Sequence, residues 1–434
     1  MDWLAAFTKH FPKKARRVGL ELEFPVVNQN GDAATWNETI SLLLATQWQQ
    51  HKEHGHIAYV TKEFYEYPVR LNTDVGAGTI ELALPPLPTL ATTKQVANEI
   101  IQEVRAAAES VGLLLLTYGI QPKTVPTDES IAPTPRNAVL QHWFPSKKSF
   151  PGGDFLHMTM TASYQVHIDV SADEAARVAT VLNWCTPACI ALCANSPIWG
   201  EKKTPMLAFR EYCWDLLRDP TPRYGIMPRV TTLEEYFALM CALPPICTKR
   251  GNEYFRFKHN ERFEEFLVSG QTTALTKDNV VRTLNATFDD VIAHNSTLWF
   301  DARLKPEFGT VELRCCDPQP LDTLCAPAAF ALGLVANLAA VEAYMLQFTH
   351  EQIKSARVDA IKRGIDGTVA GKPLRGMITT LLTLAKEGLE KLNEETTYLQ
   401  PFFDRVLQRT TPAAKALDAF AKNGIHGLLE LTRL

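Results

Sequence analysis

Four short segments, far apart along the chain, each read as a β-strand with acidic side chains on one face. They span residues 18–24, 78–84, 163–169 and 309–314. Successive side chains of a strand point to opposite faces, so Glu21 and Glu23 share one face while the apolar residues between them share the other. The apolar faces predict a core, and the acidic faces predict a sheet floor that carries charge.

The same alternation brings further polar side chains to this floor: Glu81, Gln165, His167, Glu312 and Arg314. Clustered carboxylates repel one another unless protons or cations neutralise them, so the simplest interpretation is a site for divalent metal. Carboxylate oxygens with one imidazole nitrogen suit Mg²⁺ or Mn²⁺ better than Zn²⁺. Taken alone, a Glu-x-Glu pair is also typical of an exposed strand, and a single histidine is more often a core residue.

Four arginines lie in or next to these segments: Arg210, Arg223, Arg303 and Arg314. A planar guanidinium group binds phosphate or carboxylate through two hydrogen bonds. Acids for metal together with arginines for anions are the groups that phosphoryl transfer from a nucleotide requires. For any one arginine, pairing with the many Asp and Glu residues is an equally good explanation. The chain has no GxxxxGK[ST] phosphate loop, no HExxH and no GxSxG motif.

Charge and cysteine content restrict the class of protein. A net charge of -4 over 434 residues gives no support for nucleic-acid binding. The apolar run 324–341 is better read as a buried helix than as a membrane span. Nine cysteines, no CxxC pair and no secretory signal favour a reducing cytoplasm. Cys185, Cys189 and Cys193, four residues apart, are read as the core face of a helix rather than a thiol metal site.

Strands alternate with helices early in the chain, and helices dominate late. Strands are expected at 18–27, 56–60, 63–70, 78–84, 113–118 and 156–170, a hairpin at 297–314, and helices at 37–48, 90–111 and 172–195. We expect 196–230 to be irregular, 231–295 to be mixed helix, and 121–155 to form a lid. The predicted fold is α+β, with an antiparallel sheet backed by helices. One catalytic domain is predicted over 1–434, with a sheet-bearing core at 18–320 and a helical part at 321–434.

At these residues the chain resembles the carboxylate–amine ligases of the glutamate–cysteine ligase type 2 family, which look like glutamine synthetase in their catalytic sheet. The matching stretches, in family order, are 19–23, 78–82, 118–122, 165–169, 194–198, Arg210 with Trp214, 219–225, 301–306, 309–314 and 317–320. At 120–121 the chain has Ile-Gln where family members often have Thr-His, and the loop 133–145 matches no variant.

The resemblance implies ATP and Mg²⁺ as cofactors, with Mn²⁺ as an alternative, and phosphorylation of a glutamate side chain before an amine displaces phosphate. It implies that the metal ligands are Glu21, Glu23, Glu81, His167 and Glu312. Arg314, with Glu312, would stabilise the transferring phosphoryl group, and Arg210 and Arg223 would bind substrate carboxylate or phosphate. Gln165, Arg303 and Glu21 would contact substrate or nucleotide.

The leading hypothesis is therefore a glutamate–cysteine ligase that takes small-molecule substrates, with no nucleic-acid or membrane partner. A related ligase that uses another amine or acid remains open, and so does the oligomeric state. Two further classes also remain: a non-catalytic protein that binds an amino acid or nucleotide, and a structural metal-binding protein.

Overall fold

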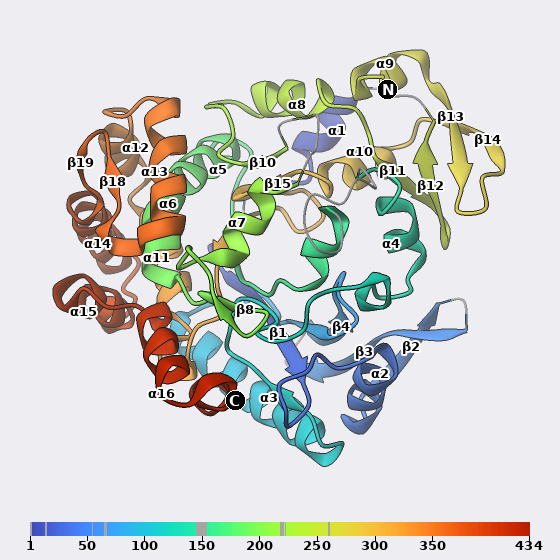
Figure 1. The fold of residues 1–434 in the computed structure, drawn as a ribbon. Coiled ribbons are helices and arrows are strands. Elements are labelled where there is room, and N and C mark those ends of the chain that lie inside the picture. Colours follow the sequence, from blue (N-terminus) through green and yellow to red (C-terminus); the bar gives the residue numbers. More distant parts are fainter. Residues whose placement is uncertain are drawn as a thin grey trace.

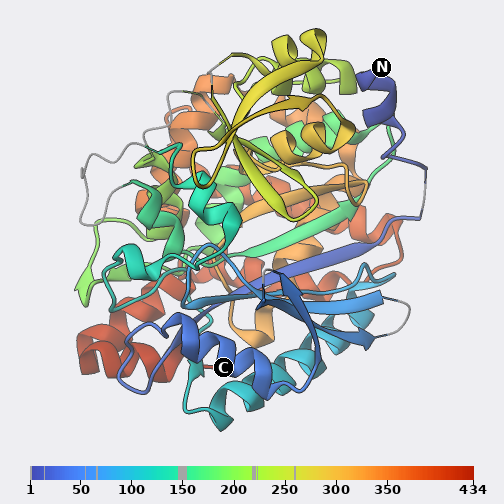
Figure 2. The ribbon, with the colours of Figure 1, turned by 90° about the vertical axis from the view of Figure 1, so that its right-hand side faces the viewer.

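A nine-stranded antiparallel sheet runs through the middle of the molecule (Figures 1 and 2). The computed structural model describes residues 2–13, 15–53, 55–64, 67–144, 154–217, 221, 223–258 and 261–434. Eight strands follow the order β16-β17-β7-β1-β5-β4-β3-β2, and β6 pairs with β1. The strands are β1 (Val18–Val27), β2 (Gln49–Glu53), β3 (His56–Phe64), β4 (Tyr67–Thr73), β5 (Thr79–Ala83), β6 (Leu114–Leu115), β7 (Tyr164–Asp169), β16 (Ala302–Lys305) and β17 (Thr310–Cys316).

Helices cover the apolar face of this sheet. Leu20, Leu22 and Phe24 of β1 are buried in the main core, where α3 and α11 pack against the strand. The helices before β11 are α1 (Trp3–Thr8), α2 (Trp36–Ala45), α3 (Leu90–Ser110), α4 (Pro135–Leu140), α5 (Ala175–Trp184), α6 (Thr186–Cys193), α7 (Phe209–Asp215) and α8 (Leu233–Cys241). The predicted combination of an antiparallel sheet with backing helices is confirmed.

The C-terminal part is helical, as predicted. It contains α11 (Ala326–Ala336), α12 (Leu338–Met345), α13 (His350–Arg363), α14 (Leu374–Lys391), α15 (Gln400–Gln408) and α16 (Pro412–Thr432), with one short hairpin of β18 (Thr368–Val369) and β19 (Lys372–Pro373). The main core includes residues of both the sheet and these helices. The assignment of the whole chain to one domain stays a prediction.

The prediction of mixed helix over 231–295 is wrong in part. This region contains the helices α8, α9 (Phe263–Ser269) and α10 (Phe288–Asn295). It also contains a separate four-stranded sheet. Its strands are β11 (Cys247–Arg250), β12 (Glu253–Phe257), β13 (Gln271–Thr276) and β14 (Val281–Asn285). Phe255, Ala274 and Leu284 form a small apolar cluster on this sheet, and Cys247 and Tyr254 belong to a second one. The sequence of these strands lacks the regular apolar alternation from which a strand is predicted.

Four smaller predictions also need correction. The strand expected at 113–118 is reduced to β6, and residues Asp154–Thr159 form a 3₁₀ helix before β7 begins. The helix expected at 172–195 breaks at Cys185, where Pro187 opens α6. The region 196–230 contains α7 and the short strands β8 (Ile198–Trp199), β9 (Lys202–Lys203) and β10 (Tyr224–Gly225), the last of which pairs with β15 (Trp299–Phe300). Continuous burial does not distinguish a strand from a short helix in sequence.

The apolar run 324–341 forms buried α11 and then bends into α12. Within the described residues, no single helix has the length and apolar character to cross a bilayer, although two sharply bent pairs pass that test when each is taken as a unit, Ala175–Trp184 with Thr186–Cys193 and Leu321–Ala336 with Leu338–Met345.

Close packing of α11 on α14 depends on glycine. A Cβ atom at Gly388 would lie 1.9 Å from the carbonyl oxygen of Gly333. We expect Gly388→Ala to lower the free energy of unfolding by about 3 kcal/mol, because the two helix backbones must separate. Gly376→Ala is the matched control on α14, since no atom lies within 4 Å of its Cβ position. We expect this control to be stabilising by up to about 1 kcal/mol. Urea denaturation measures both, and equal effects would contradict the prediction.

Candidate active site

Strand register brings the predicted acidic side chains onto one face of the main sheet. Glu21 lies opposite Gln165, and Glu23 lies opposite Glu81. Glu312 lies between His167 on one neighbouring strand and Arg303 on the other. Segments that are almost 300 residues apart in the chain therefore meet around one site, as the sequence predicts. The roles of these residues as ligands stay predictions.

Glu21, His167 and Glu312 form a compact group of metal-ligand atoms. One ligand atom of each lies within 4.8 Å of the other two. His167 Nε2 lies 3.1 Å from Glu21 Oε1 and 3.5 Å from Glu312 Oε1. The other ring nitrogen, Nδ1, lies 3.0 Å from the hydroxyl oxygen of Thr310, a contact that fixes the orientation of the ring.

This group fits a divalent cation. His167 Nε2 and Glu312 Oε1 are buried, and neither makes a hydrogen bond within the described part of the chain. The positive charge of an ion would satisfy both atoms. Burial favours the neutral form of Glu21, but the neighbouring His167 outweighs it and lowers the pKa of Glu21. Glu21 is therefore ready to bind a cation as a carboxylate.

A second acidic group lies beside the first and contains Glu23, Glu81 and Asp74. Burial, followed by repulsion from Asp74, raises the pKa of Glu23 to about 8. Burial and the neighbouring carboxylates Glu21, Asp74 and Glu23 raise the pKa of Glu81 well above its ordinary value. Burial also raises the pKa of Asp74. The raised pKa values favour bound protons in this group, and a cation would replace those protons. Asp74 is absent from the predicted site because it lies just beyond the end of a strand.

Hydrogen bonds hold Glu23 in place. The backbone N–H of Ser163 donates to Glu23 Oε2 over 2.6 Å, and Gln165 Nε2 donates to Glu23 Oε1 over 2.6 Å. Gln165 in turn accepts a hydrogen bond of 2.7 Å from Arg314. Gln165 therefore links the acids to the arginines, which is consistent with its predicted role in positioning.

Glu312 lies between two arginines. Arg303 Nε donates to Glu312 Oε2 over 2.5 Å, and Arg314 donates to the same oxygen over 2.8 Å. Burial opposes ionisation, but these two charges outweigh it and hold the pKa of Glu312 well below its usual range. Arg303 also donates to the carbonyl oxygens of Ser296 and Leu298. Most of the donors of Arg303 are therefore used within the protein, although its side chain still lines the cavity.

Arg210 reaches the same cavity from α7. It forms an ion pair with Glu211 and donates to the carbonyl oxygen of Arg314 over 2.9 Å. Its Nε is buried and makes no hydrogen bond to any described residue. A substrate oxygen could accept from this donor, in agreement with the predicted role of Arg210.

Arg223 lies elsewhere, and its position argues against the predicted contact with cofactor. Its side chain is fully buried, donates to the carbonyl oxygen of Pro244 and lies 5.0 Å from the ring of Trp143. Arg223 is not among the residues that line the acidic cavity. An arginine in a loop can bind either a ligand or the carbonyl groups of the protein itself. The sequence alone could not distinguish these two roles for Arg223. Residues 219, 220 and 222 of the matching stretch 219–225 lie outside the described residues.

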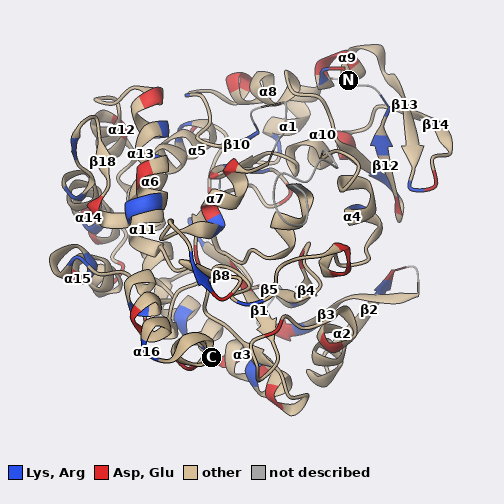
Figure 3. Ribbon diagram, viewed as in Figure 1, with Lys and Arg blue, Asp and Glu red and all other residues tan. Residues whose placement is uncertain are grey.

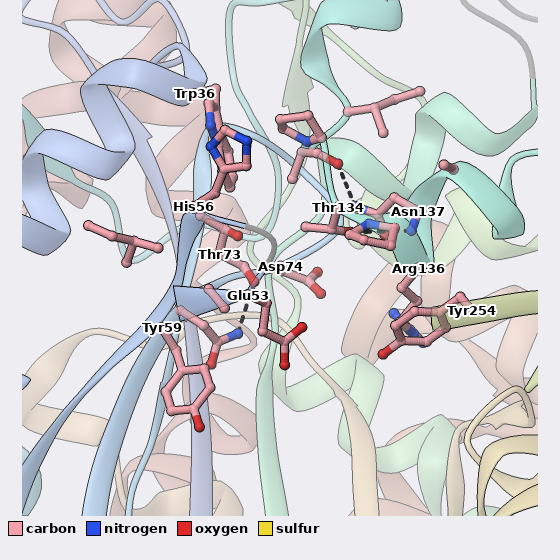
Figure 4. Close-up of a pocket in the computed structure, with 18 of the residues that line it drawn as sticks. Trp36, Glu53, His56, Tyr59, Thr73, Asp74, Thr134, Arg136, Asn137 and Tyr254 are labelled. Atoms are coloured by element: carbon pink, nitrogen blue, oxygen red, sulfur yellow. Dashed lines mark hydrogen bonds between the residues drawn. The ribbon is translucent and has the colours of Figure 1, made fainter. Parts of the chain in front are cut away.

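The carboxylates of both groups, together with Arg210, Arg303 and Arg314, line a cavity of about 260 Å³. A wider pocket of about 1260 Å³ adjoins it, and the two share Arg70, Asp74, Glu81 and Arg136 as lining residues. In Figure 4, Trp36, His56 and Tyr59 lie on one side of the wider pocket, while Asn137 and Tyr254 lie on the other. The combined space suits more than one small ligand.

Part of the predicted lid over 121–155 contributes to this wider pocket. Residues 131–138 and Gln141, on α4 and the segment before it, line the pocket. Residues 145–153 lie outside the described residues. His51 and His56 lie on β2 and β3, His56 lines the pocket, and residue 54 is not described.

The cysteines are buried, as expected for core residues. Cys189 and Cys193 of α6 lie close to Cys316 of β17, with their sulfur atoms within 4.8 Å of one another. All nine cysteines are buried and free.

Comparison with known proteins identifies the family of this chain. A sequence model of glutamate-cysteine ligase family 2 matches residues 17–430. The chloroplastic glutamate--cysteine ligase of Arabidopsis thaliana is 29% identical over 365 residues, 81% of this chain and 65% of the relative. The enzyme of Nicotiana tabacum is 27% identical over 355 residues, 79% of this chain and 64% of the relative. The chain thus covers slightly less than two thirds of the length of these relatives.

Two solved structures share the fold. Glutamate--cysteine ligase from Francisella tularensis, in complex with AMP, matches with a TM-score of 0.60 at 12% identity, over 97% of this chain and 88% of that chain. A bifunctional glutathione synthetase from Pasteurella multocida matches with a TM-score of 0.53 at 13% identity, over 99% of this chain and 52% of that chain.

Proposed function

Because the chain belongs to glutamate-cysteine ligase family 2, we propose that it is an ATP-dependent ligase that joins the γ-carboxylate of glutamate to the amine of cysteine. The observation that carries the proposal is the convergence of Glu21, Glu312 and Arg314 in one cavity, with His167 beside the two carboxylates. The Francisella tularensis enzyme was solved with AMP, which supports the use of a nucleotide. The complete set of acids and arginines favours an enzyme over a non-catalytic binding protein.

Joining a carboxylate to an amine is unfavourable in water, so the acid must first be activated. The γ-carboxylate oxygen attacks the terminal phosphorus of ATP, ADP leaves, and an acyl phosphate forms. The amine then attacks the acyl carbon, phosphate leaves, and the amine loses a proton. Enclosure of the cavity would keep water from hydrolysing the acyl phosphate.

Residues of this chain have separate tasks in these steps. The two acidic groups would hold Mg²⁺, with Mn²⁺ as an alternative, and bound Mg²⁺ lowers the repulsion between the phosphates and the incoming carboxylate. Arg314 would stabilise charge on the transferring phosphoryl group, and Arg210 would bind a substrate carboxylate. Gln165 holds Arg314 and Glu23 in their relative positions.

Product analysis tests the proposal directly. The protein is incubated with ATP, Mg²⁺, glutamate and a pool of amino acids, and the products are identified by mass spectrometry. We expect γ-glutamylcysteine together with ADP. A different γ-glutamyl product would instead identify another amine, which the departure at Ile120 and Gln121 leaves open. No ADP release with any amine would contradict ligase activity. The cytoplasmic location stays a prediction.

Binding of Mg²⁺ should release protons. The pKa of Glu23 lies at about 8, so this group is mostly protonated at pH 7 and must lose its proton to bind a cation. Apparent affinity should therefore rise with pH between 6 and 8 and level off above the pKa. Titration calorimetry of the protein with Mg²⁺, in buffers of different ionisation enthalpy, measures the released protons. Glu23→Gln should release fewer, and a heat that is independent of buffer would contradict the prediction.

A further inference from the structure

Arg357 is a buried cation in the C-terminal helical part, outside the cavity. It lies on α13, which packs against α6 and α7 (Figure 1), and only 3% of its surface is exposed. Its guanidinium group contacts three carboxylates. Nε lies 2.7 Å from Asp301 Oδ2, one terminal nitrogen lies 2.8 Å from Glu211 Oε2, and the other lies 2.9 Å from Asp215 Oδ1.

Two of these acidic residues, Glu211 and Asp301, also contact arginines that line the cavity. Glu211 is the ion-pair partner of Arg210. Asp301 accepts a backbone hydrogen bond of 2.8 Å from Arg314 through its carbonyl oxygen. In Figure 3, α7 carries acidic and basic segments in the middle of the molecule, where α13 approaches it. The guanidinium group of Arg357 therefore binds two residues that in turn contact Arg210 and Arg314.

We propose that Arg357 is a positioning residue, which fixes Arg210 and Arg314 in the cavity from the C-terminal helical part of the chain. The inference rests on the proposed function, since it assumes that this cavity is the active site. Arg357 itself does not line either cavity.

Charge balance explains why the position requires arginine. Burial raises the pKa of Glu211, and the charges of Arg210 and Arg357 both oppose this rise. Without Arg357, Glu211 and Asp301 would face each other as buried carboxylates with too few counter-charges, and the pKa of Glu211 would rise further. Glu211 would also lose the donor that orients it, so its ion pair with Arg210 would weaken. A lysine at 357 keeps the charge but cannot bridge three carboxylates with planar geometry.

Steady-state kinetics on the full chain test this role with Arg357→Lys. We expect kcat/KM for glutamate to fall at least tenfold, while the KM for ATP changes less than twofold. Arg405→Lys is the matched control. Arg405 is also a buried arginine of the helical part, but it donates to the carbonyl of Leu192 and to Gln319 instead of a carboxylate that holds Arg210. The control should leave both kinetic parameters within twofold of the wild type at a similar loss of thermal stability. Equal kinetic effects of the two variants would overturn the proposal.

A double-mutant cycle and a spectroscopic readout separate this inference from simple misfolding and from the proposed function. Glu211→Gln should reproduce most of the fall in kcat/KM for glutamate. The double variant with Arg357→Lys should show little further fall, and fully additive effects of the two substitutions would overturn the proposal. In the ¹⁵N spectrum of arginine side chains, the Nε–H signal of Arg210, assigned by its loss in Arg210→Lys, should shift in Arg357→Lys but not in Arg405→Lys. This shift is expected even if the wild type shows no ligase activity, and an unshifted signal would overturn the inference alone.

Discussion

Arg314→Met is expected to lower kcat for glutamate-dependent ADP release by about a thousandfold. Arg314 donates to Glu312 and Gln165, and it lines the cavity beside the acids. A guanidinium group that stabilises charge on a transferring phosphoryl group contributes about 10³ to 10⁵ in kcat. Methionine has a similar length and no charge, so it removes the charge without opening a large cavity.

Two further measurements keep this result interpretable. Arg314→Lys retains the charge but not the planar pair of donors, and we expect it to recover only part of the rate. The melting temperature and the KM for glutamate of each variant show whether the loss is in binding or in chemistry. A loss of less than tenfold in Arg314→Met would show that Arg314 does not contact the transferring group.

Glu21→Gln should have the second largest effect, because Glu21 belongs to the compact group with His167 and Glu312. The amide keeps the shape of the side chain but loses the negative charge that a divalent ion requires. We expect kcat/KM to fall about a hundredfold or more, as it does when a group that stabilises charge at the reacting centre is removed. We also expect the Mg²⁺ concentration for half-maximal rate to rise at least tenfold. Initial rates across a Mg²⁺ series at saturating ATP measure both.

Asp169→Asn is the matched control for Glu21→Gln. Asp169 lies on the same face of the sheet, at the end of β7, but it pairs with Arg17 over 3.0 Å and does not line the cavity. Its replacement should change the Mg²⁺ dependence less than threefold. If both variants behaved alike, general charge on the sheet rather than direct ligation would explain the metal dependence.

Alternation of apolar and charged residues was enough to predict the strands that build the site. β1, β5, β7 and β17 carry apolar side chains on one face and polar or charged side chains on the other, and this alternation predicts a strand even though both faces are largely buried. The polar strands β11 to β14 gave no such signal, because most of their side chains are exposed or half-buried on both faces. The sheet beside the wider pocket was therefore missed.

Site residues outside the strands were harder to predict. Asp74 lies in the turn before β5. Arg136 lies on the short helix α4, whose sequence shows no strand pattern and no pattern of charges. Arg357 lies on an ordinary amphipathic helix, and only its tertiary contacts distinguish it from a surface arginine. Arg223, a predicted site residue, does not line the cavity and donates to the carbonyl oxygen of Pro244. Sequence does not say whether a guanidinium group faces a ligand or the protein's own carbonyl groups.

The order of strands in the main sheet also constrains biosynthesis. β7 has β1 on one side, but its other neighbour, β17, is made about 140 residues later. Until β17 leaves the ribosome, the nascent sheet presents an open edge and carries its carboxylates without Arg303 and Arg314 to balance them. Completion of the charged floor is therefore a late event, and a chain released early would be both inactive and prone to associate through that edge.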